Sequence, residues 1–299
     1  MKGLFILFLS VCLGYLVLAY ALRWYEITNQ PEYYAKYGER TAAKVGWYAL
    51  LLFAQEYFYT VAHLLLLAGD YLLIPYYYWR YGQSRLIKGN TGCRQNNPLI
   101  LVHGYMMRGG SLWGLKRRLQ RDQRQVWLFN YSPPTQAISC FSQQLKEAVE
   151  LVLAETNKTK VDLIGHSMGG LVILNYLAFL GGDTRVNKVI TLGTPYHGSK
   201  LWALSLGNCG LQMRPHHELL QKLRESGVNE KVKFTAIYSE FDELVLPAEN
   251  ARWDAPGVNN IPVSGFGHVG ITFVKPVYDL IDQALKESPG QPAQDILDE

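Results

Sequence analysis

Hydrophobic residues gather in two long runs near the start of the chain, and in short, regularly spaced runs after residue 98. The first long run, Leu4 to Leu22, holds no charged residue and lies between Lys2 and Arg23. A helix needs about 20 apolar residues to cross a bilayer, so this run predicts a retained membrane anchor. A cleaved signal peptide is the alternative, because Ala19-Tyr20-Ala21 fits a cleavage site. The apolar core of such peptides is usually shorter, roughly 7–15 residues.

The second long run, Val45 to Trp79, is interrupted by polar residues. Glu56, His63 and Asp70 are seven residues apart, so on a helix they form one narrow stripe. Ionisable residues at membrane depth normally face protein or water, and we therefore expect this stripe to face protein. The helix would lie against the first helix, against the following domain or along the membrane surface. A soluble helical hairpin with an apolar face is the alternative, although Tyr76 to Tyr81 is typical of an interfacial aromatic belt.

The pattern divides the chain into four parts. We expect a helical membrane-anchoring region at 1–81, a polar linker at 82–97, a folded domain at 98–288 and a disordered tail at 289–299. In the folded domain, short apolar runs alternate with helical patterns. The expected strands are Leu99–Val102, Gln125–Tyr131, Lys160–Ile164, Lys188–Leu192 and Phe234–Tyr238. This alternation predicts the α/β class, with a compact, mostly parallel sheet of about six strands and helices on both faces.

Composition excludes several classes of protein. The net charge is +4 and charged residues make up 18% of the chain. The longest basic run, Lys116 to Arg118, is too short for a nucleic-acid-binding block, so no nucleic-acid partner is expected. We find no cluster with metal-ligand spacing and expect no metal. The four cysteines lack C-x-x-C spacing and Cys12 lies in an apolar run, which excludes a full disulfide framework and leaves a single bridge open.

A candidate nucleophile lies in the folded domain. The run Gly165-His166-Ser167-Met168-Gly169 follows a predicted strand and precedes the apolar helical stretch Leu171–Leu180. G-x-S-x-G between a strand and a helix is the nucleophile elbow, a sharp turn that exposes the serine hydroxyl. The turn requires glycine at positions 165 and 169, because a Cβ at either position would clash with the neighbouring main chain. Ser167 is therefore the predicted nucleophile.

The remaining catalytic groups are expected further along the chain, in the order serine, acid, histidine. Asp242 follows the predicted strand Phe234–Tyr238 and is the preferred acid, with Glu240 and Glu243 as alternatives. His268 stands in a glycine-flanked loop before the last predicted helix and is the expected general base.

The oxyanion hole in this fold is built from two main-chain N–H groups. We expect one from Tyr105, in the loop after the first strand of the domain, and one from Met168, the residue after the nucleophile.

Four motifs together resemble one family of proteins. They are Val102-His103-Gly104-Tyr105, the run Gly165 to Gly170, the run Leu192 to Ser199 and Gly267-His268. They are similar to bacterial triacylglycerol lipases and to GPI-inositol-deacylase-like hydrolases of the α/β-hydrolase superfamily. The resemblance covers about residues 98–288. It implies an α/β-hydrolase fold and a serine hydrolase that cleaves acyl lipids or hydrophobic esters, without a cofactor or catalytic metal.

The resemblance also bears on the surroundings of the site. The first ninety residues have no counterpart in the small secreted lipases, so a membrane-bound enzyme of a bacterial inner membrane is expected rather than a secreted one. The expected cover over the site is short, about Leu201 to Arg214. The same triad would also serve an acyltransferase, a thioesterase or an amidase. A non-catalytic scaffold is the third alternative, and the sequence leaves protein partners and the side of the membrane open.

Overall fold

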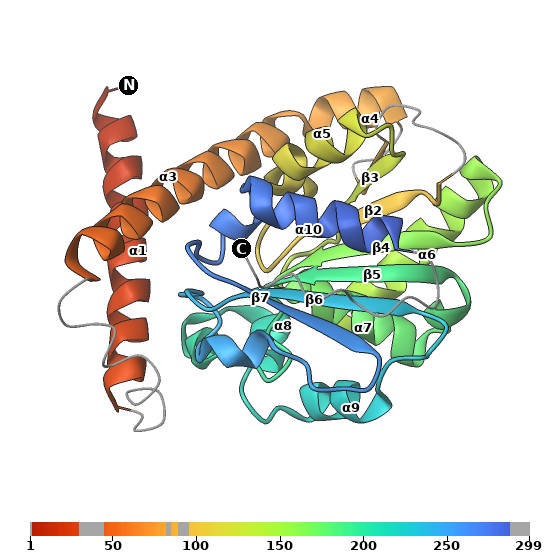
Figure 1. The fold of residues 1–299 in the computed structure, drawn as a ribbon. Coiled ribbons are helices and arrows are strands. Elements are labelled where there is room, and N and C mark those ends of the chain that lie inside the picture. The colour runs from red at the N-terminus through yellow and green to blue at the C-terminus, as the bar shows by residue number, and fades with distance from the viewer. Residues whose placement is uncertain (1, 30–44, 82–84, 89–95, 288–299) are drawn as a thin grey trace.

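A single sheet of seven strands forms the centre of the protein in the computed structural model, which describes residues 2–29, 45–81, 85–88 and 96–287. The strands lie side by side in the order β1-β3-β2-β4-β5-β6-β7 (Figure 1). All neighbouring pairs are parallel except β1 with β3. The strands are β1 Leu86–Lys88, β2 Leu99–Val102, β3 Val126–Phe129, β4 Val161–His166, β5 Val186–Leu192, β6 Lys233–Ser239 and β7 Val258–Val263.

Helices cover both faces of this sheet and bury one apolar core on each. One face carries α6 Ile138–Thr156, α7 Met168–Phe179, α8 Gly207–Gln212 and α9 Glu218–Ser226. The other carries α5 Trp113–Arg121 and α10 Lys275–Lys286. Short 3₁₀ helices connect these elements, namely η1 Gly109–Leu112, η2 Gly182–Thr184, η3 Lys200–Leu204, η4 Ala248–Ala251 and η5 Gly270–Thr272. The predicted α/β class and the two covered faces are confirmed.

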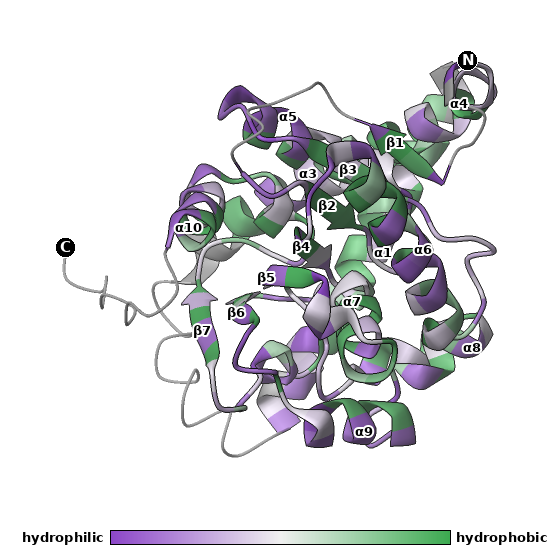
Figure 2. Cartoon of the chain, turned by 90° about the vertical axis from the view of Figure 1, so that its right-hand side faces the viewer, coloured by the Kyte–Doolittle hydropathy of each residue, from purple (hydrophilic) through white to green (hydrophobic). Residues whose placement is uncertain are grey.

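The sheet has seven strands instead of about six, and two of them, β1 and β7, are not among the expected ranges. β7 has the sequence Val-Asn-Asn-Ile-Pro-Val and contains both hydrophilic and hydrophobic residues, whereas β2 is hydrophobic throughout (Figure 2). An edge strand is half exposed, so its apolar signal is weak. The predicted linker is wrong at Leu86–Lys88, because these residues form β1 and pair with β3. The rest of that linker from 82–84 and 89–95, and the predicted tail, lie outside the described residues.

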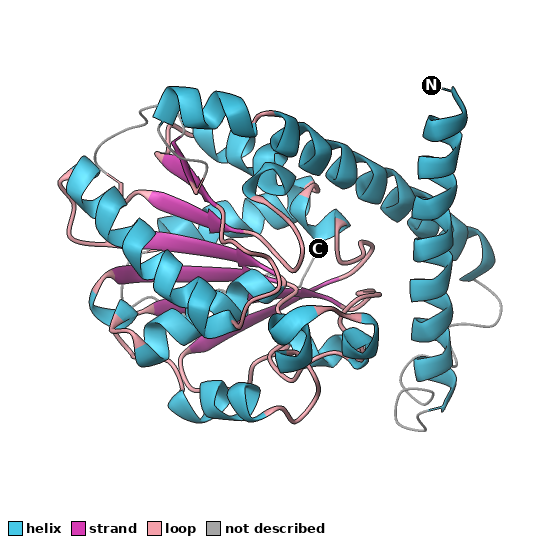
Figure 3. Cartoon of the chain, turned by 180° about the vertical axis from the view of Figure 1, so that it is seen from behind, coloured by secondary structure: helices cyan, strands magenta, loops and turns pink. Residues whose placement is uncertain are grey.

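Three further helices precede the α/β region, by which we mean residues 96–287. They are α1 Lys2–Asn29, α3 Val45–Leu72 and α4 Ile74–Tyr81. α1 runs along one side of the α/β region, and α3 crosses α1 and continues over the side of the sheet that bears α5 (Figures 1 and 3). By length and apolar composition alone, the segments Phe5–Glu26 and Leu50–Leu72 could each cross a membrane.

The polar stripe of α3 faces protein, as the sequence predicts, and the structure shows that this protein is the α/β region. Glu56, His63 and Asp70 are all buried. Asp70 forms an ion pair of 2.8 Å with Arg108, and the hydroxyl of Tyr77 in α4 donates to the same carboxylate at 2.9 Å. α3 is therefore held by polar contacts on its inner side.

Helix α7 packs on β2 more closely than a side chain would allow. A Cβ at Gly169 would overlap the carbonyl oxygen of Val102 and lie 2.6 Å from that of His103. The main chain of the helix thus lies directly on the end of the strand, as expected for a sharp strand-to-helix turn.

Gly169→Ala should therefore destabilise the protein by roughly 1–3 kcal/mol, the usual cost of forcing extra volume into a packed interior. Thermal unfolding followed by circular dichroism measures the effect. Gly114→Ala is the matched control, because a Cβ there meets only ring atoms of Phe273, at 3.8 Å or more. Equal unfolding temperatures for the two variants would contradict this account.

Candidate active site

Ser167 occupies the sharp turn between β4 and α7. Its backbone has a φ of 55° and a ψ of −128°, a strained conformation for a residue with a side chain. A Cβ at Gly165 would lie 2.7 Å from the main-chain nitrogen of Gly170, so the turn closes only with glycine there. These features are the geometry expected of a nucleophile elbow.

His268 and Asp242 meet at the same edge of the sheet, in the loops that follow β7 and β6. His268 Nδ1 lies 2.7 Å from Asp242 Oδ2, and both side chains are buried. Asp242 Oδ1 accepts the main-chain N–H groups of Leu244 at 2.9 Å and Val245 at 2.7 Å. Since a carboxylate accepts hydrogen bonds, Nδ1 of His268 carries the hydrogen, and Nε2 is the nitrogen able to accept a proton.

The alternative acids lie on the same loop in other roles. Glu243 Oε2 accepts the main-chain N–H of His268 at 2.9 Å. The main-chain carbonyl of Glu240 accepts a hydrogen bond of 2.5 Å from Arg23. Among the described residues, Asp242 is the carboxylate bonded to the ring of His268.

The charge of His268 depends on two opposing effects. Burial lowers the pKa of its ring, but Asp242 and then Glu56 raise it by more, so the net pKa lies above the ordinary value of 6.5. A general base must be neutral to take a proton, so activity should fall as the pH drops through this raised pKa. Burial lowers the pKa of neighbouring His166 well below its usual range, and its Nε2–H donates to the carbonyl oxygen of His268 at 3.0 Å.

The candidate oxyanion residues lie on either side of Ser167. Tyr105 lines the pocket, and its hydroxyl donates to the carbonyl of Leu206 at 2.9 Å. A Cβ at the preceding Gly104 would lie 3.0 Å from Cβ of Ser167, so this loop approaches Ser167 closely. Met168 is the first residue of α7, where main-chain N–H groups lack helical partners.

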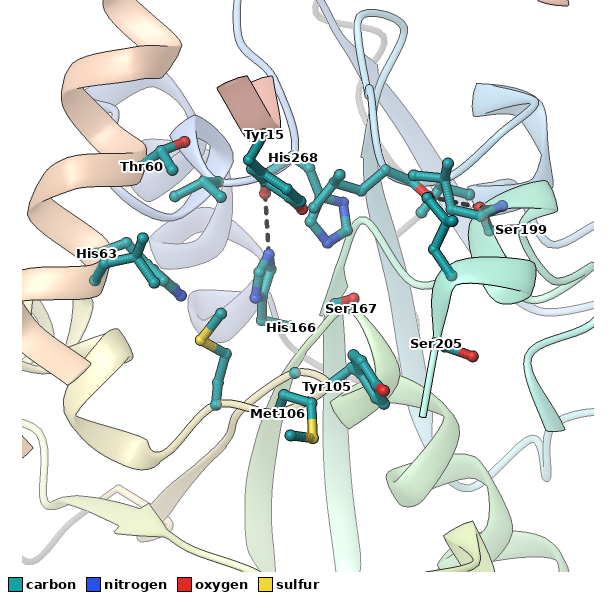
Figure 4. A pocket seen from close by; sticks show the side chains of 18 of the residues that line it. Tyr15, Thr60, His63, Tyr105, Met106, His166, Ser167, Ser199, Ser205 and His268 are labelled. Carbon is teal, nitrogen blue, oxygen red and sulfur yellow. Dashed lines mark hydrogen bonds between the residues drawn. The ribbon is translucent and has the colours of Figure 1, made fainter. Parts of the chain in front are cut away.

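Ser167 and His268 open into a cavity of about 480 Å³. Its lining is largely apolar, and the N-terminal helices form one wall. Figure 4 shows Tyr15, Thr60 and His63 among the residues that line this pocket together with Ser167 and His268. The wall residues include Phe8, Val11 and Tyr15 of α1 and Thr60, His63 and Leu64 of α3.

The cover of the cavity is larger than the expected segment Leu201–Arg214. That segment forms η3 and α8 and contributes Leu201, Trp202 and Leu204 to the lining. The helices α1 and α3 supply the rest of the cover. The length and hydropathy of these two helices predict membrane segments. Neither property predicts that the helices form a wall of the pocket.

Two residues of these helices bind the loops that carry Asp242 and His268. Arg23 of α1 donates to the main-chain carbonyl oxygens of Asp242 and Glu240. Glu56 of α3 accepts main-chain N–H groups of the His268 loop. Sequence reasoning identified Glu56 as facing protein but missed its partner, and it missed the contacts of Arg23 entirely.

Within the described ranges, no group of three His, Cys, Asp or Glu side chains is arranged to hold a metal ion. Cys12, Cys140 and Cys209 are free thiols, and Cys93 lies outside those ranges.

Comparison with known sequences agrees with the geometry. Residues 97–224 match the family described as alpha/beta hydrolase fold. The chain is 34% identical over 122 residues to a triacylglycerol lipase from Burkholderia plantarii, covering 38% of this chain and 34% of that protein. It is 37% identical over 111 residues to a triacylglycerol lipase from Pseudarthrobacter phenanthrenivorans, covering 34% of each. The matched part thus spans about a third of the length of these relatives.

Solved structures show the same architecture. Aspergillus fumigatus lipase B superimposes with a TM-score of 0.62 at 20% identity, covering 70% of this chain and 57% of that one. The mature form of Bacillus licheniformis lipase BlEst2 gives 0.59 at 17% identity, covering 67% and 97%. The α/β region has the α/β-hydrolase fold, and the predicted resemblance to triacylglycerol lipases is confirmed.

Asp242→Asn should lower kcat by about 10⁴-fold, the loss typical when the acid of such a triad becomes an amide. The two N–H groups on Oδ1 would hold the amide oxygen, so the NH₂ group would face His268 Nδ1 and impose the wrong tautomer. Steady-state kinetics on a soluble ester measures the loss. Glu240→Gln is the matched control, with a small expected effect. A larger loss in Glu240→Gln or Glu243→Gln would mean that Asp242 is not the acid.

Proposed function

We propose that this protein is a serine hydrolase that cleaves carboxylic esters of lipids or other hydrophobic molecules. One observation carries the proposal: Ser167, in a strained strand-to-helix turn, shares an apolar cavity with a histidine whose Nδ1 is bonded to a buried carboxylate. The similarity of part of the chain to triacylglycerol lipases supports the same chemistry.

In the proposed mechanism, Ser167 Oγ attacks the ester carbonyl carbon while His268 Nε2 takes the hydroxyl proton. The main-chain N–H groups of Tyr105 and Met168 bind the oxyanion that forms, and losing one such donor typically costs about 2.7–4 kcal/mol. The C–O bond of the ester then breaks, and His268 returns the proton to the leaving alcohol. Water attacks the acyl-enzyme by the same route, which releases the acid and restores Ser167. Asp242 fixes the tautomer of His268 and stabilises its positive charge.

The lining of the cavity favours a hydrophobic substrate. Side chains such as Phe8, Val11, Leu64 and Leu204 surround the nucleophile, and few polar groups face the space. A cavity of about 480 Å³ is large enough for a drug-sized apolar group. An acyl chain would remove this apolar surface from water, at roughly 25 cal/mol per Å².

Ser167→Ala should abolish both ester hydrolysis and covalent labelling by a fluorophosphonate, because the attacking oxygen is removed. Circular dichroism should remain that of the wild type. Ser205→Ala is the matched control, since Ser205 lines the same cavity and should leave labelling unchanged. Labelling or wild-type turnover in Ser167→Ala would refute the assignment of the nucleophile.

We further propose that the enzyme binds a lipid surface through the outer faces of α1 and α3, with both helices lying along that surface as a membrane anchor. The outer side of α3 carries an apolar stripe at seven-residue spacing, opposite the buried polar stripe. It consists of the exposed side chains Leu51, Phe58, Leu65 and Leu72. Contiguous apolar surface of this kind is typical of membrane or protein interaction sites.

The inner contacts of both helices support an orientation along the membrane rather than across it. Along α1, Cys12, Leu16, Ala19, Arg23 and Glu26 are buried. α3 is held from Glu56 to Asp70. A helix that contacts the α/β region over most of its length has only its outer side available to lipid.

Leu51→Glu combined with Phe58→Glu should weaken vesicle binding by roughly 10²–10⁴-fold, because each of the two side chains would lose about 1.5–3 kcal/mol of burial in the bilayer. Co-sedimentation with phosphatidylcholine–phosphatidylglycerol vesicles measures this. Hydrolysis of a soluble short-chain ester should persist, while hydrolysis of a vesicle-borne ester should fall.

Leu151→Glu on α6 is the control for this double variant, since Leu151 is 57% exposed and Phe58 70%. It should bind vesicles normally. Undiminished vesicle binding by the double variant would refute the proposed surface.

A further inference from the structure

Four consecutive main-chain N–H groups, those of residues 267–270, donate to two buried carboxylates. Glu56 reaches three of these N–H groups from α3, more than 200 residues away in sequence. Glu56 Oε2 accepts from Gly267 at 3.0 Å, and Glu56 Oε1 accepts from Val269 at 2.8 Å and Gly270 at 2.9 Å. Glu243 Oε2 accepts the N–H of His268 at 2.9 Å. The loop that carries the general base is therefore bound to Glu56 on both sides of His268.

The loop and the carboxylates fit closely. A Cβ at Gly267 would overlap both Glu243 and Glu56, and a Cβ at Gly270 would lie 2.5 Å from Glu56 Oε2. Glu56 and Glu243 are each 1% exposed. A buried carboxylate is tolerated only when donors replace its water, so moving the loop would strip Glu56 of all three donors at once.

The two carboxylates differ in the number of N–H groups that they accept, three for Glu56 and one for Glu243 from this loop. Burial, followed by the nearby Glu56 and Asp242, raises the pKa of Glu243 well above its ordinary range. Burial also raises the pKa of Glu56, but the hydrogen bonds from the main-chain N–H groups of Gly270, Val269 and Gly267 favour its charged form and oppose this rise.

We propose that Glu56 is a positioning residue for the general base, holding the main chain on both sides of His268 so that the ring stays between Asp242 and Ser167. This inference rests on the proposed role of His268. It makes α3 a part of the catalytic unit as well as a candidate membrane contact. The inner side of the helix would act on turnover, and the outer side on binding to lipid.

The charged and titratable groups around His268 determine the pKa of its ring, which can be measured. They are Asp242 and Glu243 on the loop after β6, His166 at the end of β4, and Glu56 and His63 on α3. Of these, Asp242 and Glu56 raise the pKa of His268. Removing the charge of Glu56 should therefore lower that pKa and move the acid limb of the kcat/KM profile to lower pH.

The test uses the full-length chain carrying Glu56→Gln. The oxygen of the new side-chain amide can still accept hydrogen bonds from one or two main-chain N–H groups. The NH₂ group of the amide would face the third N–H group, from which it cannot accept. We expect kcat on a soluble short-chain ester to fall by about 10²-fold, the loss that a small misplacement of a catalytic group causes. KM should change little, and the acid limb should shift to lower pH. Glu56→Asp, which keeps the charge on a shorter side chain, should lose kcat with its acid limb near that of the wild type.

Asp70→Asn is the matched control. It removes a buried carboxylate from the same helix, where the contacts are Arg108 and Tyr77 rather than the His268 loop. This variant should unfold at a lower temperature but keep the wild-type acid limb.

Wild-type kcat and acid limb in Glu56→Gln would overturn the proposal. An equal shift in Asp70→Asn would also overturn it, because general loosening of α3 would then explain the effect. Titration of the His268 ring by NMR reads the pKa without turnover, and an unchanged pKa in Glu56→Gln would contradict the proposal. Failure of the proposed function is separate: the wild type would then neither hydrolyse esters nor react with a fluorophosphonate.

Discussion

A carboxylate can be buried in protein only where hydrogen-bond donors replace the water it loses, and this constraint determines how α3 lies on the α/β region. Glu56 obtains its donors from the loop at 267–270, and Asp70 obtains them from Arg108 and Tyr77. Two such contacts, fourteen residues apart on one helix, fix both its position and its rotation. His63 is then directed into the pocket, and the apolar stripe that includes Phe58 is directed outward.

Helix α1 is held by contacts of charged side chains with loops at the same edge of the sheet. Arg23 donates to main-chain carbonyls of the Asp242 loop, and Glu26 forms an ion pair of 2.5 Å with Lys200, at the start of η3. One N-terminal helix thus binds the loop of the acid, and the other binds the loop of the histidine. A parallel sheet gathers its loops at one edge but leaves their conformations to outside contacts, and here the beginning of the chain supplies those contacts.

Local sequence patterns predict much of the fold and of the candidate site. The elbow around Ser167 depends on glycines a few residues away, and the positions of Asp242 and His268 depend on the strands before them, so all three can be predicted as candidates from the sequence alone. The edge strands β1 and β7 were not predicted, because β1 is short, β7 is half exposed, and both lack a continuous apolar signal. The partners of Arg23 and Glu56 were not predicted for another reason. The spacing of residues along a helix shows which side of the helix is buried, but not which other segment covers that side.

The two faces of α3 would connect the proposed lipid-binding surface with the proposed catalytic site. Glu56 and Phe58 are two residues apart on one helix, one against the His268 loop and the other exposed. A helix is stiff over so short a distance, so it cannot shift at its outer face without moving the carboxylate on its inner face. If both proposals hold, bilayer contact and the placement of His268 are properties of one rigid element. The hydrolytic site then belongs to the whole chain and cannot be assigned to residues 98–288 alone.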